Sequence, residues 1–158
     1  MRQVTTRARP THLDDVSKQI IEQLQEDGRR PYAAIGKAVG LSEAAVRQRV
    51  AKLLADGVMQ IVAVTDPVQV GFARQAMIGI RCNGELGRVA DALAEMPEVD
   101  YVVITAGSFD VLAEVVCEDD DHLLELIGDR IRGLDGVEST ESFVYLKLRK
   151  QLYNWGTR

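Results

Sequence analysis

The chain has 158 residues, 46% of them hydrophobic, and a formal net charge of -5 at pH 7. This length allows one medium domain or two small ones with packed cores. No apolar run approaches the roughly 18 residues of a membrane span, and no signal-peptide pattern opens the sequence. We therefore expect a cytoplasmic protein without a membrane partner.

Charge is distributed unevenly along the chain. Residues 27–57 contain six basic and three acidic side chains, whereas residues 67–158 contain nine basic and sixteen acidic ones. The overall acidity alone argues against general affinity for nucleic acid. The uneven distribution instead indicates two modules, of which only the first is suited to face phosphates.

The sequence shows no pattern typical of catalysis. We find no nucleophile with a neighbouring base, no metal-ligand spacing and no glycine-rich phosphate loop. Cys82 and Cys117 stand far apart without a C-x-x-C pattern, which favours buried free thiols over a disulfide or a metal site. We expect a protein that is not an enzyme and needs no cofactor or metal.

Residues 13–57 predict three short amphipathic helices. The first is capped by Asp14 and stops at Gly28. Its apolar stripe consists of Val16, Ile20, Ile21 and Leu24. The second helix follows Pro31, which needs no N–H donor in a first turn, and ends at Gly40, which can take a left-handed turn.

The third helix begins at Ser42, whose hydroxyl can cap free N–H groups, and ends at Gly57. Its buried stripe is expected to be Val46, Val50, Leu53 and Leu54. Arg47 and Gln48 lie on the opposite face, and both can make bidentate contacts with base edges. A solvated face is the alternative. The tight Gly-Leu-Ser turn favours a helix-turn-helix that places this helix in the DNA major groove.

Three segments flank these helices and the next module. Residues 1–12 contain three arginines without periodicity, which favours a flexible terminus, and an arm in the minor groove is the alternative. Residues 58–74 are expected to form a strand and linker with a turn at Asp66 and Pro67. Residues 149–158 form a tail to which the pattern assigns no role.

Residues 75–148 alternate strands and helices. The expected strands are 75–82, 99–105, 110–117 and 137–148, with a helix after the first and another after the third. This βαββαβ order is ferredoxin-like, with both helices on one sheet face. The predicted fold class is α+β: an N-terminal winged helix-turn-helix domain and a C-terminal ferredoxin-like domain.

The second face of this sheet is expected to be covered. Residues 77–80 and 102–104 are apolar at consecutive positions, whereas a face open to water would be polar at alternate ones. A second copy of the chain is the economical cover. A twofold dimer would also pair two recognition helices on a pseudo-palindromic DNA site.

The chain resembles the Lrp/AsnC (feast/famine) family of transcriptional regulators. The matching stretches are LDDVSKQIIEQLQEDGRR, VGLSEAAVRQRVAKLLADGVM, DPVQVGF, MPEVDYVVITAGSFDVL and GVESTESFVYLKL, in the family's order. Known members are homodimers that often associate into tetramers or octamers, and many bind an amino acid in the cleft between dimers. The resemblance implies the same partners here: double-stranded DNA, further copies of the chain and a small-molecule effector.

The resemblance also implies site residues. DNA contacts would fall on Ser42, Ala44, Ala45, Arg47, Gln48, Arg49 and Lys52. Effector contacts would fall on Gly107, Ser108, Phe109, Asp110, Thr140 and Ser142. Arg49 lies beside the buried stripe, so a structural ion pair is as well supported as a phosphate contact. Asp110 could cap a turn instead of binding the effector. Ser108 stands where many members carry an acidic residue, so the effector's identity cannot be transferred.

The sequence therefore predicts a sequence-specific DNA-binding transcriptional regulator. Its effector would be an amino acid or a related small metabolite, bound at contacts between dimers. The alternative is a chromosome-organising DNA-binding protein without an effector, which would show at most a small specificity ratio.

Overall fold

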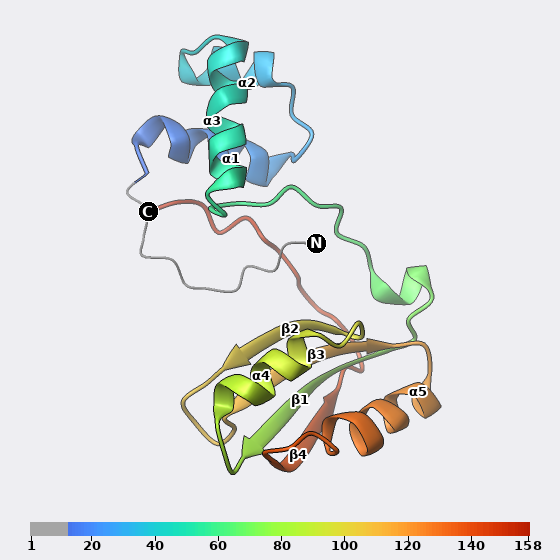
Figure 1. The fold of residues 1–158 in the computed structure, drawn as a ribbon. Coiled ribbons are helices and arrows are strands. Elements are labelled where there is room, and N and C mark those ends of the chain that lie inside the picture. The colour runs from blue at the N-terminus through green and yellow to red at the C-terminus, as the bar shows by residue number, and fades with distance from the viewer. Residues whose placement is uncertain (1–12) are drawn as a thin grey trace. The chain divides into compact units, whose positions relative to one another are not determined.

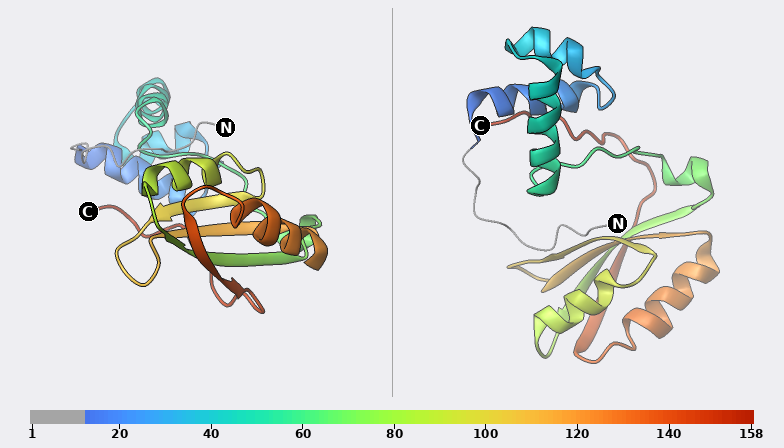
Figure 2. Two further views of the ribbon diagram at one scale, coloured as in Figure 1. Left: turned by 60° about the horizontal axis from the view of Figure 1, so that its bottom comes forward. Right: turned by 45° about the horizontal axis from the view of Figure 1, so that its top comes forward.

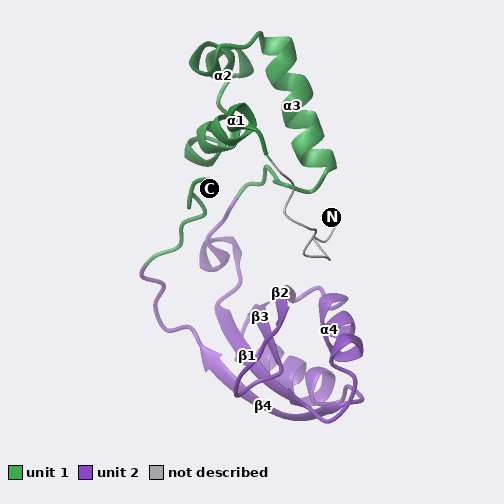
Figure 3. Cartoon of the chain, turned by 90° about the vertical axis from the view of Figure 1, so that its left-hand side faces the viewer, with its two compact units in different colours: residues 1–63, 150–158 green, residues 64–149 purple. Residues whose placement is uncertain are grey.

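The computed structural model describes residues 13–158, so the expected N-terminal arm lies outside the described residues. The chain divides into two compact units (Figure 3), residues 1–63 with 150–158 and residues 64–149. Each unit has a hydrophobic core of its own. No helix within the described residues is long and apolar enough to cross a membrane.

Three helices build the first unit: α1 (Asp15–Glu26), α2 (Tyr32–Val39) and α3 (Glu43–Ala55). Asp14 and Ser42 cap α1 and α3, because each side chain accepts a hydrogen bond from the backbone N–H three residues on. Gly40 follows α2 with a φ of 72°, the left-handed conformation expected for this turn. The apolar stripes meet in a core of Ile20, Leu24, Ile35, Val46 and Val50. The predicted helix-turn-helix is confirmed.

The prediction that Leu54 is buried is wrong. Leu54 is 40% exposed, whereas Leu53 is 5% exposed. Neighbouring residues of a helix point about 100° apart, so only one of two adjacent leucines can lie at the centre of the buried side. In α3 that residue is Leu53.

The strand expected in residues 58–66 is not formed. Residues 59–66 contain neither helix nor strand, and a short 3-10 helix, η1 (Pro67–Val70), follows them. A strand needs a hydrogen-bonded neighbour, and no segment of the described chain pairs with these residues. The first unit, as described, is thus a helix-turn-helix without a wing strand.

The C-terminal tail packs on α1, an arrangement that the sequence pattern did not predict. The Gly156 N–H donates to Gln25 Oε1 at 3.1 Å, and the Thr157 hydroxyl donates to Glu22 Oε1 at 2.5 Å. Trp155, just before these contacts, is 79% exposed. The tail therefore belongs to the helix-turn-helix unit, although it follows the last strand of the other unit.

The second unit is a four-stranded antiparallel sheet with its helices on one face (Figures 1 and 2). Its elements are β1 (Arg74–Cys82), α4 (Leu86–Ala94), β2 (Val99–Ile104), β3 (Val111–Cys117), α5 (Asp120–Glu125), the π-helix η2 (Leu126–Ile131) and β4 (Val137–Val144). The strand order is β2-β3-β1-β4. The predicted ferredoxin-like module is confirmed, except that β4 ends at Val144 rather than at residue 148. Val144 pairs with Ala76, and β1 begins only two residues before Ala76, so the residues beyond 146 have no partner in β1.

The helix-free face of this sheet carries exposed apolar side chains, as expected, beside polar ones such as Glu114. Ile78 and Ala113 pack toward the helices, so their strand neighbours Met77 and Leu112 point to the other face. Phe143 lies opposite Met77 on that face and is 44% exposed. In the single chain these side chains meet solvent instead of a second layer.

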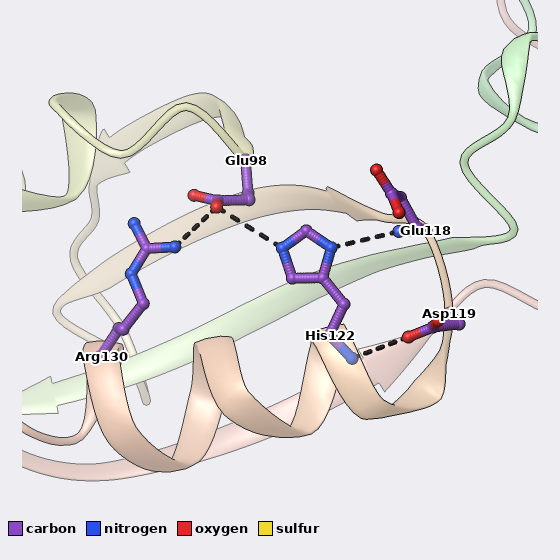
Figure 4. Close-up of polar contacts among 5 residues, drawn as sticks. All are labelled: Glu98, Glu118, Asp119, His122 and Arg130. Atoms are coloured by element: carbon purple, nitrogen blue, oxygen red, sulfur yellow. Dashed lines mark hydrogen bonds and ion pairs between the residues drawn. The ribbon is translucent and has the colours of Figure 1, made fainter.

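A polar clip joins the start of β2 to the helices that follow β3 (Figure 4). Glu98 Oε1 accepts a hydrogen bond from Arg130 Nη1 at 2.6 Å and lies 3.4 Å from His122 Nε2. The Glu98 side chain is only 14% exposed. The hydrogen bond from Arg130 holds the pKa of Glu98 below its usual value. The clip thus depends on a carboxylate that stays ionised.

Candidate DNA interface and effector loop

One face of α3 is open and suited to a groove. Its exposed residues, spaced by three and four positions, are Ala44, Arg47, Gln48, Ala51 and Lys52. The alanines would let a helix approach base edges closely, and the side chains of Arg47 and Gln48 are of the types that can hydrogen-bond to those edges. Ala45, also predicted as a contact, is half-buried at the margin of this face.

Arg47 is held in a defined orientation by two neighbours. Its Nη2 donates to Glu43 Oε1 at 2.7 Å, and its guanidinium carbon lies 5.3 Å from the centre of the Tyr32 ring. Both partners of the ion pair are more than half exposed, so the pair stabilises the chain by no more than about 1 kcal/mol. DNA can therefore displace Glu43 at little cost. Sequence reasoning did not single out Glu43 or Tyr32, although the i,i+4 spacing of Glu43 and Arg47 was a readable signal.

Arg49 forms a structural ion pair, which was one of the two roles predicted for it. Its Nη1 donates to Asp14 Oδ2 at 2.7 Å and to Ser17 Oγ at 3.1 Å, which ties α3 to the start of α1. Hydrogen bonds from Ser17 and then from Arg49 lower the pKa of Asp14 to about 2. A phosphate contact by Arg49 stays a prediction, and it would have to share this guanidinium with Asp14.

Ser42 and Lys52 also have partners within the first unit. The Ser42 hydroxyl accepts from the Ala45 N–H at 3.2 Å, and its own proton stays available for a phosphate. Lys52 donates to Asp56 at 2.8 Å, but the lysine side chain is 76% exposed. Both positions are compatible with backbone contacts beside the reading face.

The loop from Gly107 to Asp110 joins β2 to β3 and folds onto the helix-free face of the sheet. The Phe109 ring covers Gly79, where a side-chain Cβ would come within 2.8 Å of it. It also meets Phe143 edge-on, with ring centres 6.0 Å apart. Phe109 is thus fixed against its own sheet, while Gly107 and Ser108 remain exposed.

Asp110 does form the turn that was its alternative role. Its Oδ2 accepts from the Cys82 N–H at 2.8 Å, and its own N–H donates to the Ile80 carbonyl at 2.9 Å. Within residues 13–158, no donor lies at hydrogen-bond distance from Oδ1. The turn role therefore leaves one carboxylate oxygen for a cationic group, and the two readings are compatible.

Thr140 and Ser142 do not join this loop within one chain. They pair with Ile80 and Ile78 across the β1–β4 ladder, and so lie on the helix-covered side, whereas Phe109 lies on the other. Arg132 donates to the Thr140 hydroxyl at 2.8 Å. A cleft that uses all six predicted effector residues would have to be completed by another copy of the chain.

Comparisons with known proteins follow the same division of the chain. Residues 13–54 match the model of the AsnC-type helix-turn-helix domain, and residues 72–158 match that of the PF0864 C-terminal dimeric alpha+beta barrel domain. The uncharacterized HTH-type transcriptional regulator PF1231 of Pyrococcus furiosus is 34% identical over 91% of this chain and 96% of its own length. The chain belongs to the Lrp/AsnC family.

Solved structures of Lrp/AsnC regulators share the fold. The leucine response regulatory protein LrpA of Mycobacterium tuberculosis is 27% identical with a TM-score of 0.78, covering 89% of this chain and 100% of its own. The regulator NMB0573 of Neisseria meningitidis, solved as a complex with L-Met, is 25% identical with a TM-score of 0.77, covering 90% and 95%. The present Lrp/AsnC protein is thus a DNA-binding transcriptional regulator with a C-terminal domain of the dimeric type.

Proposed function

We propose that this regulator binds specific DNA sequences and that an amino acid or related small metabolite alters this binding. The loop from Gly107 to Asp110 carries the proposal, because a helix-turn-helix alone would suffice for a protein without an effector. The loop combines exposed backbone with a carboxylate oxygen that has no partner within residues 13–158. The L-Met complex of the Neisseria relative supports an amino acid as the class of effector.

The proposal includes a homodimer formed through the helix-free face, with further association into tetramers or octamers. The exposed apolar side chains on that face support it, because burying such a surface is favourable. Effector binding at contacts between dimers would bring Thr140 and Ser142 of one copy toward the loop of another. Effector binding and assembly would then be coupled, typically by about 1 to 3 kcal/mol.

Sedimentation of the purified protein, with and without each common amino acid, tests this coupling. We expect a mass of two or more chains, an even number, and a change in that mass with at least one amino acid. Asp110→Asn keeps an oxygen that can accept from Cys82 but removes the charge, so it should keep the fold and lose the response. Asp110→Ala should also weaken the turn. A single-chain mass at micromolar concentration would contradict the dimer, and a mass indifferent to every amino acid would contradict the coupling.

A further inference from the structure

Arg81, at the end of β1, is held against the Gly107–Asp110 loop, although neither the sequence pattern nor the family resemblance assigned it a role. Its Nε donates to the Ser108 carbonyl oxygen at 2.9 Å. Its guanidinium carbon lies 5.3 Å from the centre of the Phe109 ring. A hydrogen bond at one edge and a ring beneath it restrict the guanidinium to a narrow range of orientations.

The platform beneath Arg81 is itself packed. The Phe109 ring lies over Gly79 and meets the edge of Phe143, so it cannot shift easily. Restricting a long side chain usually costs conformational entropy when a ligand binds. In Arg81 much of that restriction is already present in the folded chain.

The terminal nitrogens of Arg81 remain open. Within residues 13–158 neither Nη atom has a hydrogen-bond acceptor, and Oδ1 of Asp110 has no donor. The loop and the β1 arginine held against it thus present an unsatisfied guanidinium edge and an unsatisfied carboxylate oxygen. These two groups complement the carboxylate and the ammonium of an amino acid.

We infer that Arg81 binds the carboxylate of the effector through its Nη atoms, and that the site therefore selects a free amino acid over its neutral carboxyl derivatives. The inference rests on the proposed function, whose effector it specifies. Guanidinium and carboxylate match as a planar, bidentate pair, whereas a primary amide offers one neutral acceptor and repels the fork with its N–H groups. The selectivity resides in this one contact.

Calorimetric titration of the full chain with each common L-amino acid, and with the primary amide of every one that binds, tests the inference. The wild type should prefer the acid over its amide by about tenfold or more. Arg81→Ala should lose most of this preference, because it weakens binding of the acid and leaves binding of the amide nearly unchanged. Arg81→Lys keeps the charge without the fork and should lie between the two. Arg88→Ala, which removes an exposed arginine on α4, is the matched control and should behave as the wild type.

The preference for acid over amide separates a ligand contact from a structural role. If Arg81 only supported the loop, Arg81→Ala would weaken acid and amide alike and keep their ratio, which would overturn the inference. A wild type that binds acid and amide equally would also overturn it. A wild type that binds none of the amino acids would refute the proposed effector itself, and is thereby distinguished from failure at Arg81. Arg81→Lys decides between these outcomes if Arg81→Ala does not fold.

Discussion

Arg47→Ala is expected to weaken binding to a specific DNA site by about 1 to 3 kcal/mol, while fold and assembly stay unchanged. Arg47 lies at the centre of the exposed α3 face, and its only ion pair within residues 13–158 is the solvent-exposed one with Glu43. Its loss should therefore remove the proposed base-edge contact and little internal stabilisation. Affinity measured by fluorescence anisotropy on the DNA upstream of the protein's own gene reports the change.

Two further variants make this prediction sharper. Glu43→Ala should strengthen DNA binding, because it frees Arg47 and removes a negative charge that would repel the phosphates of bound DNA. Arg88→Ala, on α4 of the other unit, removes the same charge from outside the helix-turn-helix unit and should change affinity little. Unchanged affinity of Arg47→Ala for the specific site would remove Arg47 from the reading residues.

Arg130→Met should lower the free energy of unfolding at pH 7 by about 1 to 3 kcal/mol. It leaves the carboxylate of Glu98, only 14% exposed, without its cationic partner. This expected loss of unfolding free energy is smaller than that for breaking a fully buried ion pair, because the Arg130 side chain is 35% exposed. Methionine fills a similar volume, so lost packing contributes little.

The deficit of Arg130→Met should depend on pH. In the wild type the pKa of Glu98 is lowered in the folded state, so its contribution is present above the ordinary glutamate pKa and is lost as pH falls through the folded value. The difference between wild type and variant should therefore shrink at acid pH. Urea unfolding followed by circular dichroism at several pH values measures it, with Arg88→Met, which breaks an exposed pair with Asp135, as control. A deficit of constant size down to about pH 3 would contradict the role given to the Glu98 carboxylate.

Helix caps and turns could be predicted from the sequence, but contacts between distant segments could not. Asp14, Gly40 and Ser42 act as predicted because caps and left-handed turns depend on a few adjacent residues. The order of strands and helices predicted the sheet, and the consecutive apolar residues at 77–80 and 102–104 predicted apolar side chains on its second face. Arg81 escaped notice because its partner, Ser108, is 27 residues away and offers only a backbone carbonyl.

The predictions that were wrong or missing also concern contacts between segments that are distant in the sequence. Residues 58–66 have the composition of a strand, but a strand depends on a neighbour that composition does not name. The contacts of Gly156 and Thr157 with α1 span more than 130 residues and involve ordinary polar groups. For the effector site, the sequence grouped Thr140 with Asp110 through family resemblance. The fold of one chain separates Thr140 from the Phe109 side of the loop.

The most direct test of an effector-responsive, sequence-specific regulator is one DNA titration. The purified protein is titrated against its own upstream DNA and a scrambled fragment at about 0.15 M salt, with and without a pool of the common amino acids. We expect a preference for the upstream fragment of a few kcal/mol, altered when the pool is added. Equal binding to both fragments, unaffected by the pool, would contradict this account and favour a chromosome-organising protein without an effector.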